Sequence, residues 1–235
     1  MIVAAALCPA PPLLARELTG ADPVVPDLRQ ACLDAVTVLV QSCPDLVAVI
    51  APGERTGTWD GDAGFDLSWY APGLRAEPRC GAPAGAHAAL PLPLGLGRRL
   101  LDQAGYGGAR VLQSVADHEP AARCTSLGAT LAALAKRVAV LAMADGSARR
   151  RPTAPGHRDE RATAFDAAVE RAVRGGRLDR LLGIDEALAR ELMAAGRPVW
   201  QMMAGAFGDA PVSSLVHYSD DPFGVAYLVA SLAPA

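Results

Sequence analysis

Residues 138–149 read VAVLAMADGSAR, and this stretch gives the strongest indication of the fold. Six apolar residues, 138–143, run without interruption and are followed by a polar, glycine-containing segment. An apolar run of this length predicts a buried strand that ends in a loop. Similar runs alternate with helical patterns along the chain, which is typical of a mostly parallel sheet covered by helices on both faces. Sites in such sheets lie at the carboxyl ends of the strands, so the loop after residue 143 is a candidate site.

Strands and helices of this kind are predicted over the whole chain. Apolar runs predict strands at residues 2–7, 46–50, 65–70, 110–115, 137–143, 212–218 and 224–231. Apolar periodicity, with proline or glycine at several of the ends, predicts helices at residues 26–39, 95–103, 120–136, 159–173, 185–195 and 198–207. No break in composition and no internal repeat divides the chain. We therefore predict one α/β domain over residues 1–235, a three-layer α/β/α fold with a mostly parallel, mixed central sheet.

Composition and charge narrow the class of protein. The net charge is −3, so no basic surface is expected for nucleic acid. Residues 1–7 are apolar without a basic segment before them, and prolines follow, so we interpret them as a strand rather than a signal peptide. No apolar stretch of about 20 residues predicts a membrane span. The cysteines are odd in number and scattered without a CxxC pair, as in a reduced, cytoplasmic protein; they are Cys8, Cys32, Cys43, Cys80 and Cys124.

A short motif stands at the end of each of three predicted strands. The motifs read PAPPLL at residues 9–14, IAPGE at residues 50–54 and DGSARR at residues 145–150. In order and spacing they resemble the LigB-like superfamily, the class III extradiol ring-cleavage dioxygenases and their Memo-type relatives, and in particular an actinobacterial subgroup. The resemblance covers nearly the whole chain, and further matching residues are 154–156, 159–161, 165–166, 196, 200, 204–206 and 222–225.

The resemblance implies an iron site whose ligands this chain has replaced. Family members carry iron-binding histidines at the places of Ala10 and Gly53, and a catalytic histidine at the place of Ala148. Near Trp200, where family dioxygenases carry an acidic ligand, this chain has Arg197 and no carboxylate. A non-haem Fe(II) needs two histidines and a carboxylate, and alanine and glycine supply no bond. We therefore expect no cofactor, and we expect these alanine and glycine positions to share one emptied cleft.

Several polar residues near these strand ends are candidates for a ligand site. Arg149 follows the lost catalytic position, so we expect it to enter the cleft and hold an anion with help from Ser147, while Arg150 points elsewhere. His118, after Asp117, resembles a family histidine that borders the substrate and is a candidate hydrogen-bonding or acid–base group. The alternatives are a turn cap for Ser147, a polar loop residue for His118 and a solvated arginine run.

A rebuilt metal site is a weaker hypothesis. Cys8 lies two residues before Ala10, and Glu54 lies one residue after Gly53, so both are expected near the cleft. With His118 they form a candidate ligand set, and Memo-type relatives use a cysteine in place of the carboxylate. Glu54 is also a candidate for binding an organic ligand.

The sequence therefore favours a LigB-like protein that is not an active extradiol dioxygenase and that binds a small anionic or aromatic molecule. A protein partner and self-association through the apolar C-terminal helices are further expectations. Two alternatives stay open: a ring-cleaving dioxygenase with a remodelled metal site, and a non-redox enzyme that reuses the cleft with His118 and Ser147 as catalytic candidates.

Overall fold

The computed structural model describes residues 1–20, 24–61, 67, 70 and 90–235. Its strands are β1 (Ile2–Cys8), β2 (Leu46–Pro52), β3 (Gly57–Trp59), β4 (Ala109–Val115), β5 (Val138–Met143), β6 (Val212–Asp220) and β7 (Tyr227–Pro234). Its helices are a 3-10 turn (Pro12–Leu14), α1 (Arg16–Thr19), α2 (Pro26–Gln41), α3 (Leu92–Gln103), α4 (Ala121–Ala132), α5 (Arg161–Arg174), α6 (Asp179–Leu182), α7 (Glu186–Glu191) and α8 (Arg197–Phe207).

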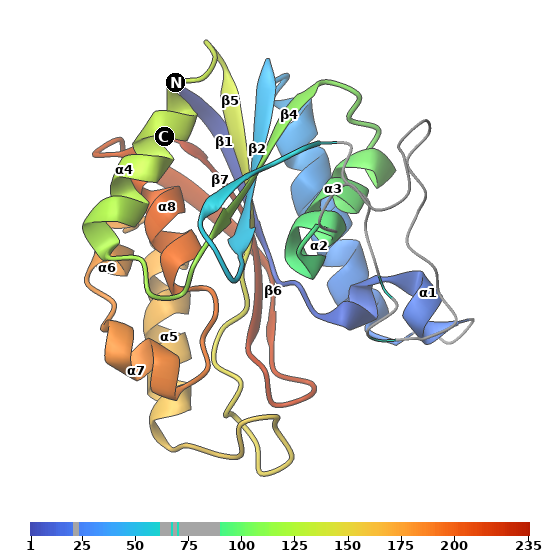
Figure 1. The fold of residues 1–235 in the computed structure, drawn as a ribbon, viewed down its shortest axis with the longest axis vertical. Coiled ribbons are helices and arrows are strands. Elements are labelled where there is room, and N and C mark those ends of the chain that lie inside the picture. Colours follow the sequence, from blue (N-terminus) through green and yellow to red (C-terminus); the bar gives the residue numbers. More distant parts are fainter. Residues whose placement is uncertain (21–23, 62–66, 68–69, 71–89) are drawn as a thin grey trace.

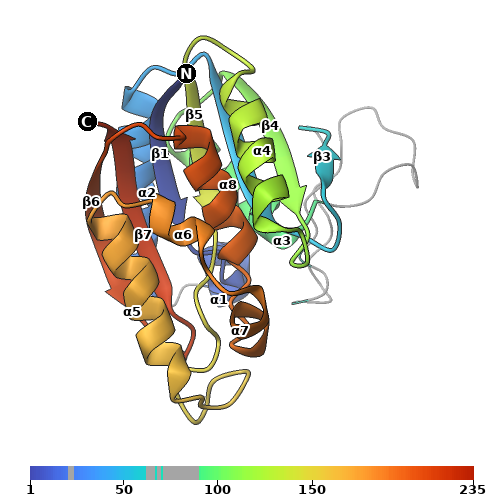
Figure 2. The ribbon, with the colours of Figure 1, turned by 90° about the vertical axis from the view of Figure 1, so that its left-hand side faces the viewer.

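All seven strands form one mixed sheet in the order β3-β4-β2-β5-β1-β7-β6. The four central strands β4, β2, β5 and β1 are parallel. β3 is antiparallel to β4, and β7 is antiparallel to both of its neighbours, β1 and β6. Helices cover both faces of the sheet (Figures 1 and 2), which confirms the predicted three-layer α/β/α class.

The strands alternate their side chains between two apolar cores because successive residues of a strand point to opposite faces. In β5, Val140 packs in the core shared with α4, α5 and α8, whereas Leu141 packs in the core shared with α2 and α3. Every residue of this strand is buried. The strand is therefore apolar on both faces, which is why its sequence shows an unbroken run rather than an alternation.

Helix α8 is held unusually close to α4, and this contact positions two side chains of the candidate site. A Cβ added at Gly128 would lie 1.9 Å from the carbonyl oxygen of Met202, and one added at Gly205 would lie 2.3 Å from that of Thr125. Only glycine allows the two backbones to approach so closely at these positions. The contact fixes α8, which carries Arg197 and Trp200.

Several boundaries differ from the prediction. Helix α3 begins at Leu92, three residues before the predicted start, because Pro93 fits the first helical turn. Helix α4 ends at Ala132 rather than near residue 136. The edge strand β3 and the one-turn helix α6 were not predicted. The strand predicted at residues 65–70 lies almost entirely outside the described residues. Among the helices that the structure describes, none has the length and apolarity required to cross a lipid bilayer.

Candidate functional site

The four parallel strands end at the same edge of the sheet, and their loops contact one another there. The backbone N–H of Ala10, after β1, donates to the Asp145 carboxylate after β5 at 2.8 Å. The N–H of Gly53, after β2, donates to the carbonyl of Val115, at the end of β4, at 3.0 Å. Ala148 lies further along its loop, where its N–H donates to the carbonyl of Leu192. A single cavity shared by Ala10, Gly53 and Ala148 stays a prediction.

Asp145 fastens the first of these loops to its neighbours. Its carboxylate accepts the Ala10 N–H, and its carbonyl accepts the N–H of Gly196 just before α8 at 2.9 Å. Burial raises the pKa of this carboxyl to about 6, and the hydrogen bond from Ala10 only partly opposes that shift. Asp145 therefore joins the ends of β1 and β5 to the start of α8.

Ser147 is fully buried and is bound to α5 through Asp166. Its backbone N–H donates to one carboxylate oxygen of Asp166 at 2.9 Å, and its hydroxyl donates to the other at 2.5 Å. Its carbonyl accepts the N–H of Ala226 at 2.9 Å. Burial raises the pKa of Asp166, and the two bonds from Ser147 oppose this shift. The Ser147 hydroxyl is thus engaged with a carboxylate rather than with a histidine.

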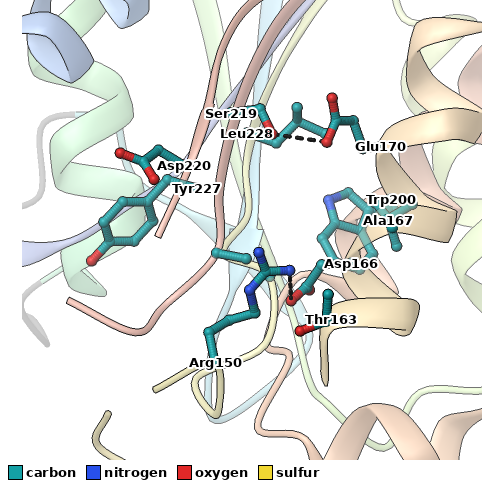
Figure 3. Close-up of a pocket in the computed structure, with 13 residues that line it drawn as sticks. Arg150, Thr163, Asp166, Ala167, Glu170, Trp200, Ser219, Asp220, Tyr227 and Leu228 are labelled. Atoms are coloured by element: carbon teal, nitrogen blue, oxygen red, sulfur yellow. Dashed lines mark hydrogen bonds and ion pairs between the residues drawn. The ribbon is translucent and has the colours of Figure 1, made fainter. Parts of the chain in front are cut away.

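A pocket, here called the α5 pocket, lies beside this pair between α5 and the β6–β7 hairpin, and its volume is about 220 Å³ (Figure 3). Its walls combine charged, hydroxyl and apolar side chains from distant parts of the chain. The lining residues are Gly146, Arg150, Thr163, Asp166, Ala167, Val169, Glu170, Trp200, Ser219, Asp220, Ala226, Tyr227 and Leu228. In Figure 3 the side chains of Asp220 and Tyr227 point away from Trp200, whereas Asp166, Ala167 and Glu170 of α5 lie on the same side as the indole.

The indole of Trp200 is the least satisfied polar group of this pocket. The residue is only 2% exposed, and its buried Nε1 has no hydrogen-bond partner among the residues that the structure describes. The nitrogen faces the space between Arg150 and Glu170 (Figure 3). A buried N–H group normally finds an acceptor, so this donor indicates an acceptor that the described part of the chain does not supply.

The two neighbouring arginines differ in their relation to this pocket. Arg150 lines it, with its Nε 2.7 Å from a carboxylate oxygen of Asp221 and its Nη1 3.6 Å from Asp166. These two carboxylates attract Arg150 to the pocket, and Asp221 lies 71 residues further along the chain. Arg149 is not among the lining residues; its side chain packs over Gly156, and its buried Nε has no partner within the described part of the chain.

The loop after β4 places its candidate histidine on the surface. The side chain of His118 is 71% exposed and contacts Asp117 at 3.3 Å. The backbone of the same loop binds Arg197, which is only 2% exposed and donates to the carbonyls of Asp117 and Glu119. Arg197 also donates to the side chain of Gln201 at 2.9 Å. The arginine at the place of the expected acidic ligand therefore ties α8 to this loop.

The three weak metal candidates differ in environment. Cys8 is buried and its thiol lies 4.0 Å from the carbonyl of Cys32, whereas Glu54 and His118 are exposed. Within residues 1–20, 24–61, 67, 70 and 90–235, no group of three or more His, Cys, Asp or Glu side chains is arranged to hold a metal ion.

Comparisons with known proteins bear on the fold. No protein-family model matches the chain, and no curated protein matches it. Among solved structures, the chain is similar to an uncharacterized protein from Escherichia coli K12, with a TM-score of 0.56 and 14% sequence identity over 98% of this chain and 99% of that chain. At this level of identity the likeness shows that the two chains share a fold.

Proposed function

We propose that this chain binds a small molecule in the α5 pocket and that it does so without the Fe(II) of the LigB-like proteins it resembles. The unpartnered indole N–H of Trp200 carries the proposal. Leaving a buried donor unsatisfied costs about 1–3 kcal/mol, and an acceptor on a ligand or a bound water removes that cost. The charged and hydroxyl groups around the indole then orient the ligand.

The residues at the inherited iron positions support binding without a metal. Ala10, Gly53 and Ala148 offer no ligand atom, and the buried cation Arg197 lies in the segment where an acidic ligand is expected. We expect purified protein to lack stoichiometric iron by elemental analysis. We also expect no yellow ring-fission product from catechols in air with added Fe(II), and formation of that product would overturn this part of the proposal. A cytoplasmic location belongs to the same proposal.

A thermal-shift screen of small molecules tests the pocket directly. A ligand at about 100 times its Kd adds about 2.7 kcal/mol to the free energy of unfolding. We expect hits whose stabilising effect is reduced in Trp200→Phe, which removes the indole donor and keeps an aromatic ring. Hits that stabilise the variant and the original protein equally would place the binding site elsewhere.

Anion binding at Arg149 is a second candidate, favoured by the buried, unpartnered Nε of that residue. Its charge already acts on Asp159, although the hydrogen bonds from Arg161 are the largest cause of the lowered pKa of that carboxyl, about 2. We expect Arg149→Gln to abolish calorimetric binding of small carboxylates or phosphates that Trp200→Phe leaves intact. Anion binding that survives Arg149→Gln would exclude this site.

The two enzymatic alternatives receive less support from the contacts. A non-redox enzyme would need Ser147 activated by a base, but its hydroxyl donates to Asp166 while the ring of His118 contacts Asp117. A remodelled oxygenase would need to bring the buried Cys8 together with the exposed His118. Self-association through the C-terminal helices remains part of the proposal and is measured by light scattering of the purified protein.

A further inference from the structure

We infer that the ligand of the α5 pocket is a small organic cation, a protonated amine that also carries a hydroxyl or another neutral oxygen acceptor. This inference rests on the proposed function and names the chemical class that the site selects. The sequence led us to expect an anionic or aromatic ligand; a cation replaces the anion here because the arginine of this pocket is already paired.

The charges around the pocket favour a cation. Two of its lining carboxylates, Asp166 and Glu170, lie on α5 one helical turn apart, and the lining cation is Arg150. The Nε of Arg150 lies 2.7 Å from Asp221, a further carboxylate next to the lining residue Asp220. The positive charge of Arg150 is therefore offset before any ligand binds, and a carboxylate ligand would meet an excess of negative charge.

Both carboxylates keep capacity to accept hydrogen bonds. Each Asp166 oxygen accepts one bond from Ser147, and one Glu170 oxygen accepts a bond from Ser219 at 2.9 Å. A carboxylate oxygen has two lone pairs, so each group can accept a further N–H donor. The partner of Glu170 on its other oxygen, Arg174, is 58% exposed, so water screens that ion pair. An ammonium group suits this wall because it offers three donors and one positive charge.

The indole of Trp200, on the same side of the pocket as these carboxylates, requires an acceptor. Its buried N–H has no hydrogen-bond partner among the described residues, and tryptophan nitrogen can only donate. The side chains of Val169 and Leu228 also line the pocket and are apolar. A suitable ligand has three parts. Its ammonium group contacts the two carboxylates, its short carbon framework contacts the apolar side chains, and its oxygen accepts the indole N–H.

Three compounds that share one framework test the charge: 2-amino-1-phenylethanol is a cation, 1-phenylethane-1,2-diol is neutral and mandelate is an anion. Their affinities are measured by isothermal titration calorimetry on the full chain at pH 7. Because a hydrogen bond to a charged group contributes about 1.5–3 kcal/mol, we expect the amine to bind about tenfold more tightly than the diol. Mandelate is expected to bind most weakly.

Variants test which side chains bind the ammonium group of the ligand and which bind its hydroxyl. Glu170→Gln and Asp166→Asn are expected to remove most of the preference for the amine over the diol. Glu186→Gln is the matched control, because Glu186 forms the same kind of helical pair, with Arg190, and lies outside the α5 pocket. Trp200→Phe is expected to remove the advantage of 2-amino-1-phenylethanol over 2-phenylethylamine, which lacks the hydroxyl. Thermal unfolding verifies that each variant is folded.

The outcomes separate this inference from the proposed function. If mandelate binds most tightly and Trp200→Phe weakens it, the cation class is overturned and the pocket stands. If all three compounds bind equally and Trp200→Phe changes nothing, both the class and the pocket are overturned. No measurable binding of any of the three also overturns the class, while the broad thermal-shift screen decides whether the pocket binds another ligand.

Discussion

Two loops leave the same edge of the sheet and use their polar residues in opposite ways. In the loop after β5, the side chains of Asp145 and Ser147 reach inward and bind the backbone of the loop after β1 and the Asp166 carboxylate of α5. In the loop after β4, the side chain of His118 lies in solvent, and it is the backbone that binds inward, to Arg197. The first loop supplies side chains to its neighbours, whereas the second is held by a side chain of its neighbour.

This difference shows that a polar residue at a strand end does not by itself indicate a reactive group. Ser147 and His118 are both polar, and both lie where a site was expected. Only the partners differ: one carboxylate on α5 and one guanidinium on α8 decide which loop buries its side chains. Four substitutions test this comparison, in decreasing order of expected effect.

Replacing Arg197 with methionine should have the largest effect on stability. Methionine keeps the apolar stem but removes every donor, so the carbonyls of Asp117 and Glu119 lose a buried partner. We expect a loss of about 3 kcal/mol in the free energy of unfolding and a Tm lower by about 6–12 °C, measured by calorimetry. The exposed Arg190→Met is the control and should change stability by less than about 0.5 kcal/mol. An unchanged Tm for Arg197→Met would show that the second loop is not held by this side chain.

Replacing Asp166 with alanine should have the next largest effect. The substitution leaves the buried N–H and hydroxyl of Ser147 without their acceptor, which costs about 2–3 kcal/mol. Ser147→Ala should cost about 1 kcal/mol, and a double-mutant cycle from denaturant unfolding should show that the two effects are not additive. Additive effects would contradict the direct coupling of this serine to α5.

Replacing Asp145 with asparagine should stabilise the protein at high pH. Burial raises the pKa of Asp145 to about 6 from an ordinary 3.8, so between these values the folded chain holds a proton that the unfolded chain has released. The contribution of this carboxyl to stability is therefore greatest below about pH 4 and falls as the pH rises through about 6. Asparagine can accept the Ala10 N–H without carrying a charge. We expect a gain of about 1–2 kcal/mol at pH 8.

Thermal unfolding of both proteins from pH 4 to pH 8 measures this difference. The gain for Asp145→Asn should shrink toward pH 4, where the folded aspartate is protonated and, like asparagine, carries no charge. Comparing the two proteins at each pH removes the contributions of other carboxyls, such as Asp159, whose pKa is lowered. A variant that is less stable at pH 8 would show that the charge of Asp145 is favourable.

Replacing His118 with alanine should have the smallest effect. The imidazole is exposed and contacts only an equally exposed Asp117 among the described residues, so we expect a change below about 0.5 kcal/mol in stability. Binding of small amines to the α5 pocket should also be unchanged. A loss of ligand binding in this variant would move the functional site from the loop after β5 to the loop after β4.

The fold was largely predictable because its signals are local. Runs such as residues 138–143 are apolar over their full length, and the structure confirms them as central strands. The strand Gly57–Trp59 was missed because three residues at an edge give neither a run nor an alternation.

The candidate site was less predictable because its groups come together only through packing. The loop at residues 145–150 was located from its motif, but Glu170, Trp200 and Ser219 reach the same pocket from α5, α8 and β6. No spacing in the sequence relates these residues. The orientation of Arg150 likewise depends on Asp221, which follows it by 71 residues in the chain.

The pairing of β1 also determines when this protein can finish folding. Residues 5–7 of β1 pair with residues 230–232 of β7, although β1 leaves the ribosome more than two hundred residues earlier. Until β7 is synthesised, one edge of β1 is an apolar strand without a partner, which is a site for chaperone binding or aggregation. Ribosome-bound chains that stop before residue 227 should therefore crosslink to chaperones and be cleaved readily by proteases, and both properties should disappear once residues 227–234 have left the exit tunnel, on a C-terminal linker or after release.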